Sequence, residues 1–198
     1  GAGITFPDLA VVTSEDQLME AVIAGKPSFP VVLKAMGLLH KSDAGGVVLN
    51  LRTEEELIAA YRDLVTRLSP PAVTVEAMCD LSAGVEVIVG SQQDPRFGPV
   101  VLVGLGGVFT EVLADVAFAL APVSADTAKA LLTSLRGAPL LMGARGRSPV
   151  DLDALAEVVV SVSRVAEVHP EIAELEVNPV LASAVGCVAL DARAILGD

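Results

Sequence analysis

Two segments near the end of the chain alternate apolar and polar residues with the period of two that is typical of half-buried β-strands. They span residues 174–181 and 187–193, and only the short, turn-like segment Ser183–Gly186 separates them. Strands joined by so short a connection pair antiparallel, as a β-hairpin. The pattern therefore predicts that the chain ends in an antiparallel sheet.

The register of this hairpin predicts which polar residues share a face. Pairing that is symmetric about the turn places Asn178 opposite Asp191 and Glu176 opposite Arg193, and opposed β-carbons lie about 5 Å apart. Amide and carboxylate oxygens gathered in this way suit Mg²⁺, a hard cation that prefers oxygen ligands. The alternative is a solvated strand face with one cross-strand salt bridge, and spacing alone does not choose between the two. The alternating apolar residues are expected to face the core: Leu175, Val177, Val188 and Leu190.

The composition argues against several classes of function. Acidic residues outnumber basic ones by 25 to 13, and this net charge of −12 disfavours binding to nucleic acids or anionic membranes, which requires a basic surface. The long apolar runs are interrupted by Gly, Pro or charged residues, so no membrane-spanning helix is expected. The two cysteines, Cys79 and Cys187, fit neither a disulfide framework nor a zinc site, and the cytoplasm is the simplest location.

Patterns along the whole chain predict alternating strands and helices. Helices are expected to begin at the caps Ser14, Thr53 and Ser124 and at Pro149, which would occupy the first helical position. Six apolar runs are expected to be strands: residues 30–34, 73–78, 85–89, 100–103, 108–113 and 116–120. This order predicts a mixed α/β or α+β fold in two lobes that divide near residues 69–74.

A second group of residues has the composition of a phosphate site. The spacing is not that of a P-loop, yet several donors that suit an anion occur close together: Lys34 at the end of a buried strand, Lys41, Ser42, and the amides of Gly45 and Gly46. His40 could accept a phosphoryl group or shuttle a proton. The alternative is a polar loop with a glycine turn.

A third feature is a glycine-rich bend at residues 104–107, which joins two predicted strands. It lacks the third glycine of a Rossmann fingerprint, and a strand rather than a helix follows it. Glu111 and Asp115 come after the bend. A bend of this kind indicates either tight sheet packing or the close approach of backbone to a ligand.

Eight short motifs, spread over nearly the whole chain, resemble those of one family and occur in the same order. They are Pro30–Lys34, His40–Gly46, Gly84–Gly90, Asp94–Pro99, Leu105–Glu111, Gly143–Gly146, Glu174–Pro179 and Ala189–Ala192. Each motif is only moderately specific, but eight in order are difficult to obtain by chance. In these motifs the chain resembles the ATP-grasp domain of the NDP-forming acyl-CoA synthetases, which are relatives of the succinyl-CoA synthetase β chain.

The resemblance implies an ATP-grasp fold in which two lobes, residues 1–72 and 73–198, grip ATP or ADP together with Mg²⁺. It implies that Asn178 and Asp191 bind the metal, which are the positions that the hairpin register brings together. It also implies nucleotide contacts at several residues: Lys34 on the adenine and α-phosphate side, Glu76 at the adenine edge, Glu86, and Lys41, Ser42, Gly45 and Gly46 in the loop over the phosphates.

The family's reaction is acyl-CoA + ADP + phosphate ⇌ acid + CoA + ATP, by way of an acyl phosphate and a phosphorylated histidine. The resemblance implies that His40 relays the phosphoryl group or contacts it, and that Glu111 contacts the phosphohistidine loop or the metal shell. It implies a CoA-binding and phosphohistidine-bearing domain or subunit as the partner. Family members normally have a further helix before the first residues, so a trimmed N-terminus is expected.

Two other functions are compatible with most of these motifs. One is a non-catalytic nucleotide-binding module of a multidomain protein lysine acetyltransferase. The other is a different ATP-grasp ligase that works through an acyl phosphate. The sequences His-Lys-Ser-Asp and Asp-Pro-Arg-Phe-Gly-Pro favour the synthetase and the acetyltransferase module over the third function.

Overall fold

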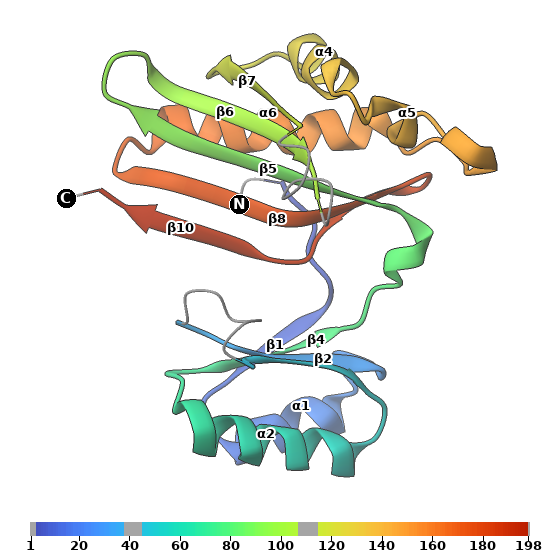
Figure 1. Cartoon of the computed structure of the whole chain (residues 1–198). Helices are drawn as coiled ribbons and strands as arrows, with labels where there is room; N and C mark the ends of the chain where they lie inside the picture. The colour runs from blue at the N-terminus through green and yellow to red at the C-terminus, as the bar shows by residue number, and fades with distance from the viewer. Residues whose placement is uncertain (1–2, 38–44, 107–114, 198) are drawn as a thin grey trace. The chain divides into compact units, whose positions relative to one another are not determined.

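The computed structural model describes residues 3–37, 45–106 and 115–197, and these residues form two compact units (Figure 1). Pro7–Cys79 is the first, called the small unit here, and Asp80–Asp198 together with Gly1–Phe6 is the second, the large unit. Each unit has its own antiparallel sheet and its own hydrophobic core. The predicted mixed class, with two sheets and helices, is confirmed.

The small unit is a four-stranded antiparallel sheet with both of its helices on one face (Figure 1). In the sheet order β1-β4-β2-β3, the strands are β1 (Leu9–Val12), β4 (Val73–Ala77), β2 (Val31–Ala35) and β3 (Val47–Leu51), and the helices are α1 (Glu15–Ala24) and α2 (Glu54–Leu68). Leu33 and Val75 of the central strands are buried against Leu18, Leu57 and Leu64 of the helices. This contact between sheet and helices is the core of the unit.

Both helices of the small unit begin where the sequence predicts. The Ser14 hydroxyl accepts a hydrogen bond from the Gln17 amide (3.3 Å), and the Thr53 hydroxyl accepts one from the Glu56 amide (3.3 Å). In each case a side chain satisfies an amide that the first helical turn leaves without a partner. Gly25 ends α1 in the left-handed conformation (φ 64°), which glycine adopts without a steric penalty.

The large unit is a six-stranded antiparallel sheet with its longest helix packed against one face (Figure 1). The strand order is β10-β8-β5-β6-β7, and β9 pairs with β8. The elements are β5 (Val85–Asp94), β6 (Gly98–Leu105), β7 (Val116–Leu120), β8 (Ile172–Ser183), β9 (Gly186–Ala189), β10 (Ala192–Leu196), α4 (Ala125–Ser134), α5 (Ala138–Leu141), α6 (Leu152–Val168) and the short 3₁₀ turns η1 (Leu81–Ala83) and η2 (Ala144–Gly146).

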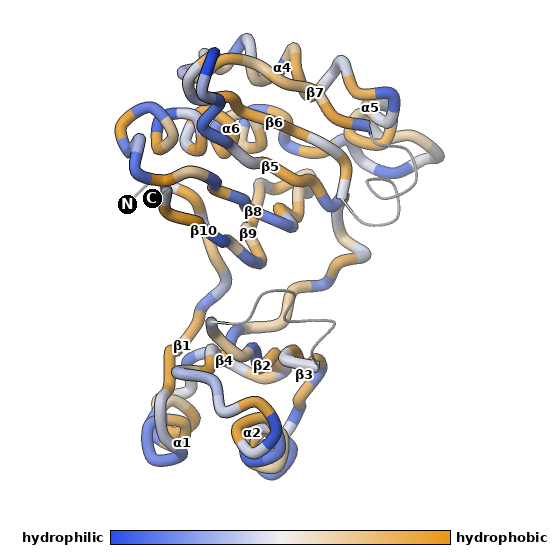
Figure 2. Tube along the Cα trace, turned by 60° about the vertical axis from the view of Figure 1, so that its left-hand side comes forward, coloured by the Kyte–Doolittle hydropathy of each residue, from blue (hydrophilic) through white to orange (hydrophobic). Residues whose placement is uncertain are grey.

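The core of the large unit lies between the sheet and α6. Val87 and Val89 of β5, Val101 and Val103 of β6 and Val159 of α6 all have no exposed surface. Figure 2 shows β6 as largely apolar, whereas hydrophilic residues interrupt β8. Among the helices of residues 3–37, 45–106 and 115–197, none is both long enough and apolar enough to span a bilayer.

The last helix begins later than the sequence suggests. The prediction that it starts at Pro149 is wrong, because α6 begins at Leu152 with Asp151 as its cap. The Asp151 carboxylate accepts a hydrogen bond from the Ala154 amide (2.9 Å). The Asp151 amide donates to the Ser183 carbonyl (2.7 Å). Because this bond ties the segment to the end of β8, the backbone becomes helical only after it.

The two central strands of the large sheet are longer than predicted and form one hairpin. They join at the expected turn, where the Asp94 carboxylate accepts hydrogen bonds from the amides of Arg96 (2.8 Å) and Phe97 (3.0 Å). β7 and α4 lie where the sequence places them. The strand expected at residues 108–113 lies outside the described residues.

The two units divide at Asp80 rather than at residue 73. With lobes of 1–72 and 73–198, β4 would open the second lobe, but it pairs with β1 and β2 inside the small sheet. Thr5 belongs instead to the large unit, where its carbonyl accepts a hydrogen bond from the Ala189 amide (2.8 Å). Pairing between strands distant in the sequence sets this boundary, so local patterns do not reveal it.

Candidate functional site

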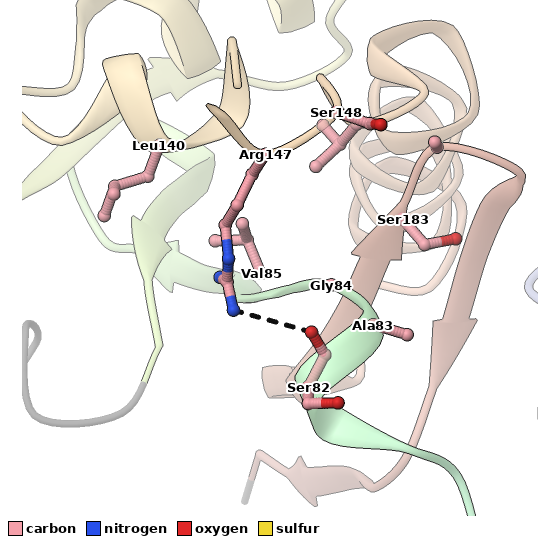
Figure 3. A pocket seen from close by; sticks show the side chains of 10 residues that line it. Ser82, Ala83, Gly84, Val85, Leu140, Arg147, Ser148 and Ser183 are labelled. Carbon is pink, nitrogen blue, oxygen red and sulfur yellow. Dashed lines mark hydrogen bonds between the residues drawn. The ribbon is translucent and has the colours of Figure 1, made fainter. Parts of the chain in front are cut away.

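A cavity of about 270 Å³ opens in the large unit beside η1 (Figure 3). Two of its hydroxyl groups have partners, because Ser82 Oγ donates to the Asp80 carboxylate (2.7 Å) and Ser183 Oγ to a backbone carbonyl (3.1 Å). The Arg147 guanidinium reaches the Ser82 carbonyl (3.5 Å). Of the predicted catalytic, nucleotide-binding and metal-binding residues that the structure describes, none lines this cavity. The polar groups that the sequence singles out lie elsewhere, on the two sheets.

The C-terminal hairpin has the register that its alternation predicts. β10 pairs antiparallel with β8, and Arg193 lies opposite Glu176. Two residues away, the Asn178 amide donates a hydrogen bond to the Asp191 carbonyl (3.0 Å). The apolar residues of β8 that precede Asn178 pack against the core, as predicted. The hairpin therefore brings the backbones of Asn178 and Asp191 together.

Asn178 lies at a β-bulge, and this corrects one part of the prediction. The register between β5 and β8 shifts here, so that two residues of β8 face one residue of β5. Because of the extra residue, the alternation of side chains between the two faces of the sheet shifts by one position beyond the bulge. Ala189 and Cys187 therefore pack against the core. The prediction that Val188 and Leu190 face the core is wrong.

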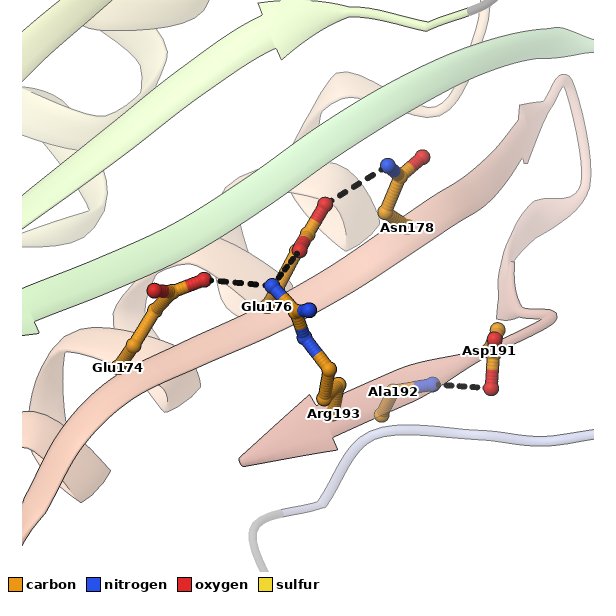
Figure 4. Close-up of polar contacts among 6 residues, drawn as sticks. All are labelled: Glu174, Glu176, Asn178, Asp191, Ala192 and Arg193. Atoms are coloured by element: carbon orange, nitrogen blue, oxygen red, sulfur yellow. Dashed lines mark hydrogen bonds and ion pairs between the residues drawn. The ribbon is translucent and has the colours of Figure 1, made fainter. Parts of the chain in front are cut away.

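A chain of polar contacts runs along the face of β8 opposite α6 (Figure 4). The Arg193 guanidinium contacts the carboxylates of Glu174 (2.8 Å) and Glu176 (3.1 Å). The second oxygen of Glu176 accepts a hydrogen bond from the side-chain amide of Asn178 (2.8 Å). The predicted cross-strand salt bridge is thus present. Its carboxylate, Glu176, is also hydrogen-bonded to Asn178, the residue that the sequence assigns to a metal.

The oxygen donors of the hairpin fit a magnesium ion that is shared with a phosphate ligand. Asn178 offers a carboxamide oxygen and Asp191 a carboxylate, both of which are hard donors. The Asp191 carboxylate accepts a hydrogen bond from the Ala192 amide (3.0 Å) just before β10, and Figure 4 shows the side chains of Asn178 and Asp191 pointing in different directions. Within the described residues, no group of three or more His, Cys, Asp or Glu side chains could enclose a metal. The donor set therefore suits an ion whose remaining ligands come from phosphate and water.

The small unit carries a second polar cluster, on the face of its sheet opposite α1 and α2. The Lys34 ammonium lies 2.7 Å from the Glu76 carboxylate, and the two side chains are only 13% and 9% exposed. The other oxygen of Glu76 accepts a hydrogen bond from the Thr74 hydroxyl (2.6 Å). The sequence singled out Lys34 and Glu76 separately and missed Thr74. The signal was available, because Thr74 precedes Glu76 by two residues on one strand and so shares its face.

Apolar side chains lie beside this ion pair. On the neighbouring strand, Leu9 is paired with Glu76 and Val11 with Thr74. Both are large apolar residues with about half of their surface exposed, at 45% and 53%. A few convergent polar groups among apolar side chains are characteristic of surfaces that bind small ligands.

Cys79, at the end of the small unit, is electrostatically coupled to the same pair. Burial is the main cause that raises the pKa of its thiol, while the Lys34 charge lowers that pKa and the Glu76 charge raises it. The thiol is therefore less acidic than a free cysteine, which disfavours a role as a nucleophile. Cys79 is better understood as part of the half-buried wall beside the pair.

Gly45 and Gly46 lie next to the strand that carries Lys34. The Ala35 amide donates to the Gly46 carbonyl (2.7 Å), directly after Lys34 on β2. Gly45 has a φ of 67°, which favours glycine at that position, and its carbonyl accepts from the Arg67 guanidinium (3.2 Å). Gly45 therefore lies in a turn, which the phosphate-site and the polar-loop interpretations of this segment both include. His40, Lys41 and Ser42 lie outside the described residues.

Glu86 shares the face of Asn178 on the large sheet. Val87 and Val177, the next residues along β5 and β8, both point into the core, so Glu86 and Asn178 point away from it. The Glu86 carbonyl accepts a hydrogen bond from the Gly106 amide (2.7 Å). A β-carbon on Gly106 would lie 2.9 Å from the β-carbon of Glu86. Tight sheet packing thus accounts for this glycine of the bend.

Asp115 has a structural role that the sequence did not assign. Its carboxylate is buried and accepts hydrogen bonds from the amides of Arg136 (2.9 Å) and Gly137 (2.8 Å), just before α5. Both oxygens are used in this way, so Asp115 fixes the start of α5 against the edge of the sheet. Glu111 lies outside the described residues.

Comparison with known proteins identifies close relatives. A family model described as an ATP-grasp domain matches residues 1–196. The β subunit of acetate–CoA ligase [ADP-forming] I from Pyrococcus furiosus is 39% identical over 203 residues, which cover 98% of this chain and 86% of that subunit. Acetate–CoA ligase [ADP-forming] I from Archaeoglobus fulgidus is 36% identical over 99% of this chain, which spans only 29% of that longer protein.

A solved structure has the same fold. It is the dinucleotide-forming acetyl-coenzyme A synthetase 1 of Ca. Korarchaeum cryptofilum in complex with coenzyme A and Mg-AMPPCP, with its phosphohistidine segment pointing towards the nucleotide binding site. The TM-score is 0.83 at 38% sequence identity, and the match covers 99% of this chain and 87% of that chain. The likeness extends through both units.

Proposed function

The chain belongs to the ATP-grasp domain family, and we propose that it is the nucleotide-binding, phosphoryl-transferring part of an ADP-forming acyl-CoA synthetase. The reaction would be acyl-CoA + ADP + phosphate ⇌ acid + CoA + ATP. The hairpin register carries the proposal, because it joins Asn178 and Asp191 at a backbone distance of 3.0 Å. The two relatives named above are both ADP-forming acetate–CoA ligases, which supports the same reaction class.

Each unit carries candidate residues for binding the nucleotide or its metal. In the small unit, Lys34 supplies a cation for phosphate oxygens, Glu76 orients it, and the amides of Gly45 and Gly46 suit an anion. In the large unit, Glu86 is the candidate for contact with the nucleotide, and Asn178 and Asp191 are the candidates for binding Mg²⁺. The Mg-AMPPCP bound by the Korarchaeum relative supports a magnesium nucleotide as the ligand.

Phosphoryl transfer depends mainly on positioning and on neutralising charge. Mg²⁺, when bound, would supply positive charge beside the phosphate oxygens. Lys34 would supply a cation for phosphate oxygens, and its salt bridge with Glu76 fixes the direction of the ammonium group. Apolar side chains beside the pair, Leu9 and Val11, would exclude water from the base.

The partner would be a CoA-binding and phosphohistidine-bearing domain or subunit. The relative from Archaeoglobus fulgidus is a single longer protein of which this chain spans 29%, which supports a further functional part. His40 would then relay the phosphoryl group from the partner's histidine or contact it, and Glu111 would contact the phosphohistidine loop or the metal shell. Both described cysteines are free thiols, which agrees with a location in the reducing cytoplasm.

The comparisons favour this function over the two alternatives. The named relatives are ADP-forming CoA ligases. An acetyltransferase module or a different ATP-grasp ligase would be expected to resemble proteins with those functions instead. A synthetase part also explains why this chain matches 86% of a separate β subunit and 29% of a longer protein. The same domain can occur as a subunit or within a longer chain.

Calorimetry with ADP at several magnesium concentrations tests the proposal. The chain should bind ADP more tightly when Mg²⁺ is present, and Asp191→Ala should abolish that gain. Glu157→Ala is the matched control, because Glu157 is an exposed carboxylate on α6, at the opposite face of the sheet. The absence of heat with Mg·ADP, from a sample that is folded by circular dichroism, would refute the proposal.

A second experiment tests the reaction itself. The chain would be mixed with the CoA-binding part of the same enzyme, acyl-CoA, ADP and phosphate, and ATP formation would be followed. Turnover that requires both proteins is the expected result. If binding of Mg·ADP is normal but no ATP forms with an active partner, the chain is a nucleotide-binding module and not a synthetase part.

A further inference from the structure

The side chain of Asn178 stands at an irregular place in the sheet. Two residues of β8 face one residue of β5 at this point, and the register resumes on either side. Bulges of this kind turn a side chain away from the direction that a regular strand would give it. The carboxamide of an asparagine can rotate so that its oxygen and its NH₂ group exchange places, and the two groups have nearly the same size. A hydrogen bond to a neighbour is therefore needed to fix which of them points in a given direction.

Glu176 supplies that contact and decides which end of the carboxamide faces it. Glu176 is in an ion pair with Arg193, and an ionised carboxylate can only accept hydrogen bonds. The group of Asn178 that lies 2.8 Å away must therefore be the NH₂ donor. The reverse orientation would place two oxygens against each other. The carboxamide oxygen of Asn178 accordingly points away from Glu176, as Figure 4 shows.

Arg193 in turn fixes Glu176. The pairing of β10 with β8 sets Arg193 directly across from Glu176, and its guanidinium contacts Glu174 as well. Two carboxylates on one strand repel each other, and the guanidinium between them holds both in place. The order of contacts is therefore Arg193 to Glu176 to Asn178, from one strand to the other.

We infer that Arg193 and Glu176 are positioning residues, which hold the carboxamide of Asn178 so that its oxygen, and not its nitrogen, is presented to the cation of the nucleotide. The inference rests on the proposed function, because it concerns the same magnesium ion. Arg193 and Glu176 would thus affect the affinity for the metal although neither of them contacts it. Residues behind a metal ligand commonly change metal affinity by about 10- to 100-fold when they are replaced.

The decisive substitution is Glu176→Gln, which keeps the size of the side chain and adds a donor. The new amide oxygen would accept from Arg193, and its NH₂ would then face Asn178 and turn the carboxamide of Asn178 around. The apparent affinity for Mg²⁺, obtained from calorimetric titrations of ADP at a series of magnesium concentrations, should fall by about tenfold. The affinity for ADP without Mg²⁺ and the thermal midpoint should stay unchanged.

Glu174→Gln is the matched control. Glu174 lies on the same strand and the same face and contacts the same guanidinium, but unlike Glu176 it is not hydrogen-bonded to Asn178. The apparent affinity of this variant for Mg²⁺ should stay within about twofold of that of the unchanged chain, since a solvent-exposed ion pair contributes little. A tenfold loss in both variants would show that the negative charge of the strand matters and would overturn the positioning role.

A double-mutant cycle separates positioning from direct contact with the metal. If Glu176 acts through Asn178, then Glu176→Gln should add nothing to Asn178→Ala, and the double variant should bind Mg·ADP as weakly as Asn178→Ala alone. Additive losses would show that Glu176 contacts the metal or the phosphate itself, and the inference would fail.

The two proposals can fail separately. If the unchanged chain binds ADP with no dependence on Mg²⁺, the proposed function fails, and the inference fails with it. If the unchanged chain requires Mg²⁺ but Glu176→Gln binds Mg·ADP as tightly as the unchanged chain, only the inference fails. Loss of magnesium dependence in Glu176→Gln, together with retention in Glu174→Gln and no additivity with Asn178→Ala, supports both.

Discussion

The two sheets of this protein each carry an ion pair, and the pairs differ in exposure. Lys34 and Glu76 in the small unit are 13% and 9% exposed, whereas Arg193 and Glu176 in the large unit are 39% and 30% exposed. In both clusters a carboxylate of the pair also holds a third polar side chain. The free energy of unfolding depends more strongly on a buried ion pair than on a half-exposed pair of similar geometry.

Burial makes each member of the small-unit pair depend on the other for stability, whereas the large-unit pair is reached by water. Removing one partner of a buried pair leaves a charge without compensation, which costs about 3–5 kcal/mol. The same change in a pair that water reaches costs about 0–1 kcal/mol. We therefore expect substitutions in the small unit to alter stability and binding together, and substitutions in the hairpin to alter binding alone.

Lys34→Met should have the largest effect, because it leaves the Glu76 carboxylate buried without a cation. The free energy of unfolding of the small unit should fall by about 3 kcal/mol. The measurement is urea denaturation followed by the fluorescence of Tyr61, which is buried in the small core and is the only tyrosine of a chain without tryptophan.

The double variant Lys34→Met/Glu76→Met is the control for this change. Two apolar side chains replace the pair, so stability should return to within about 1 kcal/mol of the unchanged chain. Binding of Mg·ADP should be lost in the single and in the double variant, because both lack the Lys34 ammonium. Equal stability of the single variant and the unchanged chain would contradict the view that this pair is effectively buried.

The buried carboxylate of the large unit, Asp115, gives the next effect. Its two oxygens accept from two different amides, and Asp115→Asn would set an NH₂ group against one of them. Urea denaturation followed by circular dichroism should show a loss of about 2 kcal/mol. Asp94→Asn is the control, because one oxygen of half-buried Asp94 accepts from both turn amides and an asparagine can keep both bonds. A loss of the same size in the control would refute the explanation.

Arg193→Met sharpens the comparison from the other side. The guanidinium is well exposed, so the free energy of unfolding of the large unit should change by less than about 1 kcal/mol. The apparent magnesium affinity in calorimetry should nevertheless fall by about tenfold. A loss of stability above about 2 kcal/mol would show that the hairpin pair is as important to folding as the buried pair.

The last expected effect appears only at alkaline pH and concerns the half-buried thiol of Cys187. Burial raises its pKa to about 11, against about 8.5 in an unfolded chain. The native state favours the neutral thiol, so this contribution to stability is complete below pH of about 8.5 and is lost as the pH rises towards about 11. Comparing the pH dependence of urea denaturation in the unchanged chain and in Cys187→Ala isolates it. Parallel curves between these pH values would contradict the assignment.

Local sequence patterns were sufficient for most helix starts and for the hairpin register, whereas the strands β1 and β3 were not predicted. Ser14 and Thr53 cap helices through bonds to amides three residues away, and such contacts need no other part of the chain. Asn178 and Asp191 meet because one short turn and a period of two determine the pairing. The family resemblance came from the same short motifs.

Tertiary structure alone decided how these pieces combine. Lys34 and Glu76 are 42 residues apart, and they meet only because β2 and β4 are neighbours in the sheet. The bulge at Asn178 depends on pairing with β5, and the start of α6 depends on a bond to Ser183. Hydrogen bonds within a few residues can be read from a local pattern. The pairing of distant strands is selected by the packing of the whole core, which no short segment of the sequence contains.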